Sequence, residues 1–254
     1  MKKTILGALA LLTALAGRAQ EFGTQISIAA PGSKTVSSAA RTPTATERSE
    51  WLSPFEVVEI DATVDIRFVE VAATETPRII YDTKGDSTTK FRAEARNNVL
   101  RIRERADSHR MARTTVTVYY NTLRSLTLTD ADAVFETPLS AQMFDLTVGA
   151  RATLQAQMDI QDLKMELSGN GSRAVLSGQV RYLTLEASTG RVVADDLVCE
   201  SAVVTAKNKA RVTLDATDRL EAKTSLSGTI GYKRDPRLLR TSQSLLAGEI
   251  ARIE

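Results

Sequence analysis

Gly169 and Gly171, in the stretch SGNGS, are the residues whose spacing first suggests chemistry. With Ala174 in the third position, they resemble the loop that binds a dinucleotide pyrophosphate at the start of a helix. A P-loop would also need a Lys-Ser or Lys-Thr ending, which is absent. The run that follows, RAVLSGQV, is short, contains β-branched valines and is interrupted by Gly178, so it predicts a strand. We therefore expect a tight turn, with Asn170 at the positive-φ position.

Glu166 and Glu186 form a second candidate, because a repeat of about 20 residues would bring the two carboxylates onto adjacent strands. Neighbouring strands lie about 4.8 Å apart. A retaining glycosidase uses two carboxyl groups at about 5 Å. The alternative is a solvated face on which Lys164 and Thr205 relieve the repulsion between like charges. No insertion that could form a cleft interrupts the repeats here, which favours the solvated face.

Two short acidic runs could contribute to a cation site. Asp130 lies two residues before Asp132, and Asp195 directly precedes Asp196. Calcium needs several oxygen ligands from one loop, and neither run offers enough of them for a full shell. The sequence therefore predicts no metal ligand.

A cluster of arginines is the main basic feature of the sequence. The cluster could form an ordinary solvated face, or it could bind an acidic glycan or lipopolysaccharide. Glu104 and Asp107 interleave with the basic residues, which is typical of a solvated face. No aromatic residues suited to base stacking accompany them, so we expect no nucleic-acid partner. The cluster consists of Arg101, Arg103, Arg105, Arg110 and Arg113.

Cys199 and His109 are the single cysteine and the single histidine of the chain. The surrounding sequence LVCES predicts a buried, inert thiol. One cysteine leaves no internal disulfide in an exported protein, and no motif surrounds His109 in the polar stretch RADSHRMAR. The sequence thus offers no catalytic residue and no residue that binds a cofactor.

The first 19 residues predict a signal peptide. Lys2 and Lys3 precede the apolar run TILGALALLTALA, and small residues near Ala19 suit cleavage after that position. The run is too short to span a bilayer, so we expect no integral membrane segment after cleavage; a retained anchor is the alternative. Export would place the protein in the periplasm, at the outer membrane or on the cell surface.

Charge and composition exclude several classes of protein. Residues 1–19 carry three of the 33 basic residues and none of the 31 acidic ones, so the exported chain is close to neutral. It therefore lacks the excess of basic residues that is typical of nucleic-acid-binding proteins. With 43% hydrophobic and 25% charged residues among 254, the chain can form a core. Aromatic residues make up only 5%, and the abundance of Val, Ile and Thr favours strands.

Two segments follow the predicted signal peptide. Residues 20–50 are rich in Ser, Thr, Ala and Pro and predict a flexible tether, and residues 51–254 predict the folded domain. From Val58 to Phe68 apolar and polar residues alternate, with a bend expected at Asp61–Thr63. Further strands are expected at Arg78–Tyr81, Phe91–Ala95, Val99–Arg103 and Thr115–Tyr120.

After Leu123 the sequence repeats with a period of about 20 residues. This period, with two or more short strands per repeat, predicts a parallel β-helix, or solenoid, of six or seven coils. A β-sandwich is the alternative, but it gives no reason for a fixed offset between inward residues. At the offset of SGNGS, neighbouring repeats carry turn residues of the types that adopt positive φ at little cost, namely Gly149, Gly190, Asn208 and Gly228. The repeating apolar pairs are Leu126/Leu128, Leu146/Val148, Met165/Leu167, Leu185/Ala187, Val204/Ala206 and Ala222/Thr224, and Gly248/Ile250 predicts a last, imperfect coil.

The stretches FEVVEIDATVDIRF, NNVLRIRER, TVTVYYNTLRSLTLTDADAV, LKMELSGNGSRAVLSG and SLSGTIGYKRDP resemble the bacterial family described as "putative auto-transporter adhesin, head GIN domain", common in Bacteroidetes. The resemblance is clearest over residues 54–236. It departs from the family where Lys233–Asp235 stand between Tyr232 and Pro236. It implies an all-β, pectin-lyase-like parallel β-helix and a role in adhesion, with no catalytic residues to carry over.

These observations predict an exported, non-enzymatic interaction module that binds a glycan or an envelope or surface protein through the faces of a solenoid. The same faces would also allow a homo-oligomer. The alternatives are a carbohydrate-active β-helix enzyme, either a polysaccharide lyase or a hydrolase, and a purely structural envelope component. A groove with Glu166 and Glu186 at its floor would favour the enzyme, and a flat, mixed face would favour binding.

Overall fold

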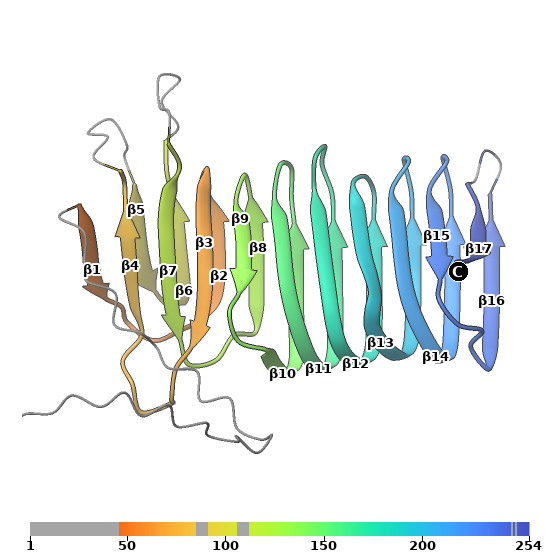
Figure 1. Cartoon of the computed structure of the whole chain (residues 1–254), viewed down its shortest axis with the longest axis horizontal. Helices are drawn as coiled ribbons and strands as arrows, with labels where there is room; N and C mark the ends of the chain where they lie inside the picture. The colour runs from red at the N-terminus through yellow and green to blue at the C-terminus, as the bar shows by residue number, and fades with distance from the viewer. Residues whose placement is uncertain (1–45, 85–90, 106–111, 245, 247, 254) are drawn as a thin grey trace, which may run out of the picture. The chain divides into compact units, whose positions relative to one another are not determined.

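The computed structural model describes residues 46–84, 91–105, 112–244, 246 and 248–253. The predicted signal peptide and most of the predicted tether lie outside these residues. The described residues contain strands and no helix, and they form a β-solenoid, as the repeat predicted (Figure 1). No described helix is therefore long and apolar enough to cross a membrane.

Each coil of the solenoid has two faces. The long central strands run along one face, bend at the lower edge in Figure 1 and continue along the other face, and a tight turn at the upper edge leads into the next coil. These strands are β10 (Leu139–Val148), β11 (Thr153–Leu167), β12 (Arg173–Ala187), β13 (Arg191–Ala206) and β14 (Arg211–Thr224). The shorter strands β8 (Ser125–Thr129) and β9 (Asp132–Phe135) precede them, and β15 (Thr229–Tyr232), β16 (Leu238–Gln243) and β17 (Ile250–Arg252) follow.

The strand register confirms the predicted repeat. Leu128 pairs with Val148, and Val148 pairs with Leu167, in parallel strands. The same column continues through Ala187 and Ala206 to Thr224. Ile230 pairs with Ile250, so the expected last coil is present.

The N-terminal coils follow an order that the sequence did not predict. Strands β2 (Phe55–Asp61) and β3 (Val64–Glu70) form a coil with the expected bend between them. This coil comes first in the sequence, yet it lies between the coil of β6 (Asn98–Arg103) with β7 (Thr114–Tyr120) and the coil of β8 with β9. The chain therefore adds its second coil on one side of the first, and every later coil on the other side.

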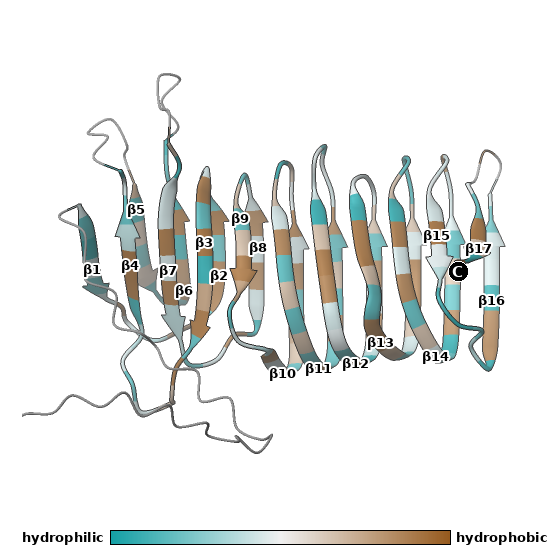
Figure 2. Cartoon of the chain, in the orientation of Figure 1, coloured by the Kyte–Doolittle hydropathy of each residue, from teal (hydrophilic) through white to brown (hydrophobic). Residues whose placement is uncertain are grey.

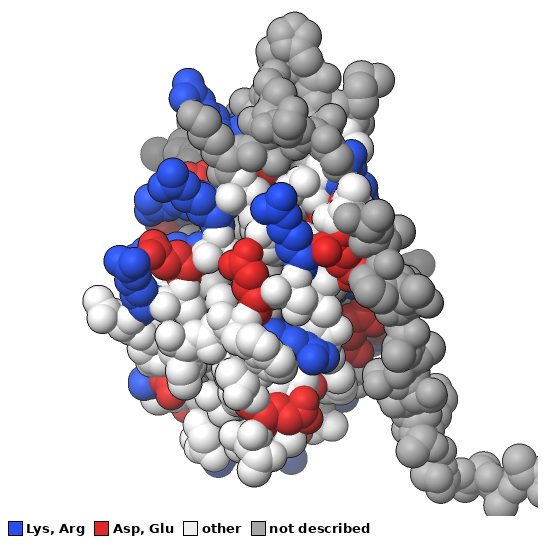
Figure 3. All heavy atoms as spheres, turned by 90° about the vertical axis from the view of Figure 1, so that its left-hand side faces the viewer, with Lys and Arg blue, Asp and Glu red and all other residues white. Residues whose placement is uncertain are grey.

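Antiparallel strands close the N-terminal end of the solenoid. Strand β4 (Arg78–Asp82) pairs with β7, β1 (Glu47–Trp51) pairs with β4, and β5 (Arg92–Arg96) pairs with β6. Figure 3 shows basic and acidic side chains interspersed on this end, and charged residues on edge strands hinder pairing with other chains. Strand β1 begins at Glu47, within residues 20–50, for which the sequence predicted a tether.

Alternating side chains fill the interior. Along β2 and β3 the inward residues from Val58 to Phe68 are at most 2% exposed, and Figure 2 shows the matching alternation of hydrophobic and hydrophilic residues on the ribbon. At the lower edge the alternation slips, and two consecutive residues stay out of the core. These pairs are Gln142–Met143, Gln161–Asp162, Arg181–Tyr182 and Glu200–Ser201.

The upper corners are turns that contain residues with positive φ and positions where the backbone of the next coil approaches closely. In SGNGS the positive φ values belong to Gly169 (+89°) and Gly171 (+77°), so the prediction that Asn170 takes this conformation is wrong. Gly228 has no positive φ and is needed for another reason, since a Cβ atom there would lie 2.3 Å from the Ala206 carbonyl oxygen. The chain continues after SGNGS as strand β12, which confirms a turn at this position and removes the helix that a dinucleotide site needs.

Candidate functional site

Glu166 and Glu186 are register partners on neighbouring strands, as the repeat predicted. They belong to an outward column that runs through Thr127, Thr147, Glu166, Glu186, Thr205 and Lys223. Both carboxylates are 55% exposed on the open sheet face. The Lys164 ammonium lies 3.6 Å from Glu166, and Lys207 forms an ion pair with Glu186. The pair therefore has the features of a solvated face, with lysines that offset its charge.

The acidic runs are engaged by basic side chains. Asp132 and Asp65 both form ion pairs with Arg113, whose guanidinium also donates to the carbonyl oxygens of Val64 and Asp130, each at 3.1 Å. Arg113 thus ties three segments of the N-terminal coils together. Among the described residues, no group of three or more His, Cys, Asp or Glu side chains could hold a metal ion.

The second acidic run lies beside Lys233–Asp235, the segment in which the sequence departs from the pattern of the family that it resembles. The Lys233 ammonium lies 3.1 Å from an Asp196 carboxylate oxygen, and the Arg234 guanidinium donates two hydrogen bonds of 2.6 Å to Asp215. Asp215 is 1% exposed, so Arg234 compensates a buried charge. Lys233–Asp235 therefore stabilise the C-terminal coils.

The predicted basic cluster does not act as one group. Arg101 forms an ion pair with Glu59 at 2.8 Å, and Arg113 belongs to the network described above. Arg110, like His109, lies outside the described residues. Cys199 is fully buried, as predicted, and burial together with the nearby charge of Asp215 raises the pKa of its thiol to about 12.

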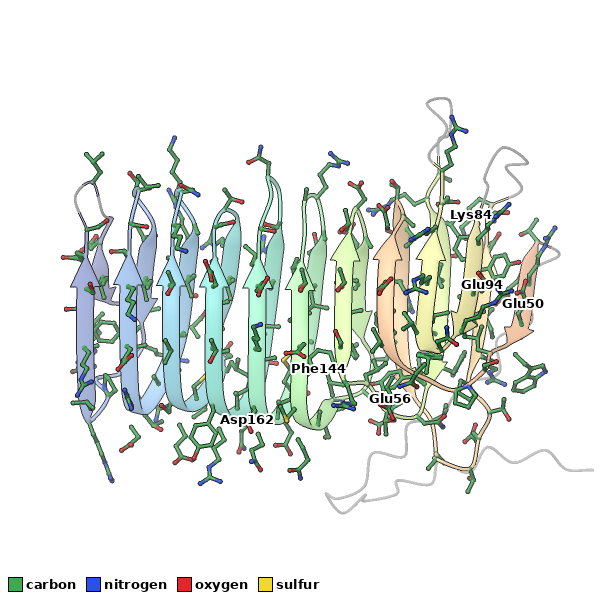
Figure 4. All side chains as sticks on the ribbon, turned by 180° about the vertical axis from the view of Figure 1, so that it is seen from behind. Glu50, Glu56, Lys84, Glu94, Phe144 and Asp162 are labelled. Carbon is green, nitrogen blue, oxygen red and sulfur yellow. The ribbon has the colours of Figure 1, made fainter. Side chains whose placement is uncertain are left out.

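One concave feature of the described residues is a groove of about 1030 Å³ along the lower edge of the solenoid. Its lining residues come from β10 to β14, from the segment before β8 and from Glu56 at the start of β2. Figure 4 places Glu56, near one end of the groove, and Asp162, beside its central part, at this edge of the ribbon. Neither Glu166 nor Glu186 lines the groove.

Two rows of outward, mostly polar side chains run along this lower-edge groove. The first row follows the register Ser140, Asp159, Gln179 and Val198. The second row consists of the outward corner residues Gln142, Gln161, Arg181 and Glu200. Between them lie Ala141, Ile160 and Val180. Because the strands are parallel neighbours, groups in each row repeat at about 4.8 Å.

Apolar side chains are also open to solvent along this edge. Met143 is 65% exposed and Val198 is 37% exposed, and both line the groove. Tyr182 is 41% exposed beside it, with the guanidinium carbon of Arg181 5.0 Å from the centre of its ring. Tyr, Met and Arg are the residue types enriched where proteins bind partners.

The groove is nearly balanced in charge. Its charged lining residues are Glu56, Arg124, Asp159, Arg181 and Glu200. Two ion pairs use four of them, Glu56 with Arg124 at 3.7 Å and Arg181 with Glu200 at 3.2 Å. Asp159 forms no ion pair within the described part of the chain, so the lining carries a single net negative charge.

Sequence reasoning missed this groove, although the sequence contains its signal. Along Thr153–Leu167 the inward residues are spaced by two, until Ile160 is followed by Leu163. Such a slip marks a bend at which two side chains face outward. The repetition of this slip in β12 and β13 locates the groove residues.

Comparison with protein families assigns residues 54–236 to the model described as "Putative auto-transporter adhesin, head GIN domain". The chain belongs to this family. The match covers the coils from β2 to β15, including the lower-edge groove, over the residues that the resemblance in the sequence implied. No curated protein matches the sequence.

Solved structures share the fold of this head GIN domain. A putative adhesin from Bacteroides fragilis NCTC 9343 has a TM-score of 0.74 at 17% identity, over 82% of this chain and 96% of that one. A putative adhesin from Parabacteroides distasonis ATCC 8503 has a TM-score of 0.61 at 16% identity, with the same coverage of both chains. A putative lipid binding protein from the same organism has a TM-score of 0.57 at 16% identity, again covering 82% and 96%. At these identities the likeness shows the fold alone.

Proposed function

We propose that this head GIN domain is an exported, non-enzymatic interaction module of the adhesin type, and that a glycan or a protein ligand binds in the lower-edge groove. The groove carries the proposal. It is a concave surface on a rigid parallel scaffold, lined by outward side chains that the fold does not require for packing. Ligand sites are concave and are largely formed before the ligand arrives.

The chemistry of the described residues supports binding rather than catalysis. The stacked carboxylates Glu166 and Glu186 lie on an open face, with lysines beside them and no cleft around them. A glycosidase needs its carboxyl groups beside a bound sugar. The thiol of Cys199 is buried and protonated at neutral pH, so it lacks the thiolate that a nucleophile needs.

A blocking substitution tests the proposal whatever the ligand is. The chain without residues 1–19 is screened against a glycan array, against envelope proteins in a pull-down, and against phosphatidylcholine vesicles. Ser140→Trp would place a large side chain in the groove, and we expect it to weaken the binding that the screen finds by at least about tenfold. Thr147→Trp adds the same bulk on the open sheet face and should leave binding unchanged.

Two outcomes would contradict the proposal. One is a ligand whose affinity is the same for Ser140→Trp and for the unmodified protein. The other is release of sugar fragments from a polysaccharide by the unmodified protein, with loss of that release in Glu166→Gln. Thermal melting of each variant shows whether it remains folded.

A further inference from the structure

We infer that the ligand of the lower-edge groove is a neutral, linear glycan chain that lies across the coils. The inference rests on the proposed function and gives its ligand a chemical class. It follows from the amide side chains of the groove, from their spacing and from its charge.

The amide groups provide the hydrogen-bonding pattern. Gln142 and Gln161 belong to one row, and Gln179 lies in the other row beside Asp159. A glutamine side chain offers two donors and one acceptor oxygen at the same site. Sugar hydroxyl groups also donate and accept, so such amides can satisfy neighbouring hydroxyls without any charge on the ligand.

The spacing of the coils fits a repeating ligand. Four coils contribute to the two rows, so the rows extend over about 14 Å at the spacing of parallel strands. A linear glycan presents one sugar at intervals close to this coil spacing. Successive sugars would therefore meet equivalent positions on successive coils. The side chain of Met143, which is 65% exposed at the groove, suits the less polar faces of the sugar rings.

The charge of the groove disfavours an anionic chain. Arg124 and Arg181 are already paired with carboxylates, and Asp159 adds a net negative charge to the lining. A polyuronate or another anionic glycan would bring like charge next to Asp159 and Glu200. A neutral chain avoids this repulsion, and its binding should depend little on ionic strength.

Calorimetric titration of the chain without residues 1–19 tests the inference. The neutral probes are hexasaccharides of glucose, mannose, galactose and xylose, the anionic probe is a hexagalacturonate, and a phosphatidylcholine vesicle serves as the lipid arm. We expect saturable binding of at least one neutral hexasaccharide and none of the hexagalacturonate or the vesicle. Raising NaCl from about 50 mM to about 500 mM should change this affinity by less than about twofold.

Substitutions in the groove connect that binding to the amides. The double variant Gln161→Ala, Gln179→Ala should weaken the neutral glycan by about tenfold through the loss of two hydrogen-bonding groups. Gln157→Ala removes an exposed glutamine of the same strand outside the groove, and it should bind like the unmodified protein. Melting curves confirm that each variant is folded.

The failure of this inference differs from the failure of the proposed function. Absence of binding to every neutral hexasaccharide overturns the inference, and so does equal loss of affinity in Gln157→Ala. If Ser140→Trp still abolishes binding of a protein, an anionic glycan or a vesicle, the groove remains the ligand site and only its ligand class is wrong.

Discussion

The upper corners and the lower edge of the solenoid turn the same chain by different means. At the upper corners the chain leaves the strand, and residues with positive φ occur in turn after turn, from Arg151 to Ser227. At the lower edge the strand continues through the bend, and the pairs of outward residues include Gln, Met, Asp, Arg, Tyr, Glu and Ser. Positive φ thus imposes a steric cost on side chains at the upper corners, including those of Arg151 and Lys209, and the outward pairs of the lower edge carry no such cost. A surface whose side chains are not dictated by the fold is available for a ligand.

The largest effect should come from a substitution at an upper corner. Gly169→Ala would force a side chain into positive φ, with its Cβ 2.7 Å from the Ala150 Cα atom. We expect the free energy of unfolding to fall by about 2–4 kcal/mol, measured by urea denaturation. Gln157→Ala, on the sheet face, should change it by less than about 0.5 kcal/mol. Equal stability of the two variants would remove the distinction between corner and sheet.

A smaller effect of opposite sign should come from another upper corner. Lys209 holds φ at +67°, although it is not a glycine, and its side chain is exposed. Lys209→Gly should raise the free energy of unfolding by about 0.5–1 kcal/mol, because glycine adopts this conformation without the clash of a Cβ atom. Chemical denaturation measures the change, and a loss of stability would show that Lys209 contributes more through its side chain than it costs in strain.

The sequence predicted the fold well where the repeat is regular. The inward column from Leu128 to Thr224 and the neighbouring Glu166 and Glu186 followed from spacing alone, because parallel stacking converts a fixed period into contact. The position of the β2–β3 coil between later coils did not follow, since strand patterns carry no information about which coil stacks on which side. The antiparallel pairing of β1 with β4 was missed for the same reason.

The candidate site was predicted less well than the fold. The sequence indicated residues with reactive groups, such as Glu166 and Cys199, as candidates. The structure places Glu166 on an open face and Cys199 in the core. The groove is lined by amides, charged groups and apolar side chains at a slip in the alternation, and none of these is a chemical motif. The slip beside Gln161 indicates a binding surface only when the bends of neighbouring coils are aligned in space.

One paired measurement tests whether the lower edge is a binding surface on a scaffold whose stability does not depend on it. The free energy of unfolding and the affinity for the bound hexasaccharide are measured on Gln161→Ala, Gln179→Ala. We predict an unfolding free energy within about 0.5 kcal/mol of the unmodified protein and an affinity about tenfold weaker. An unchanged affinity, or a loss of affinity explained by loss of folded protein, would contradict the account.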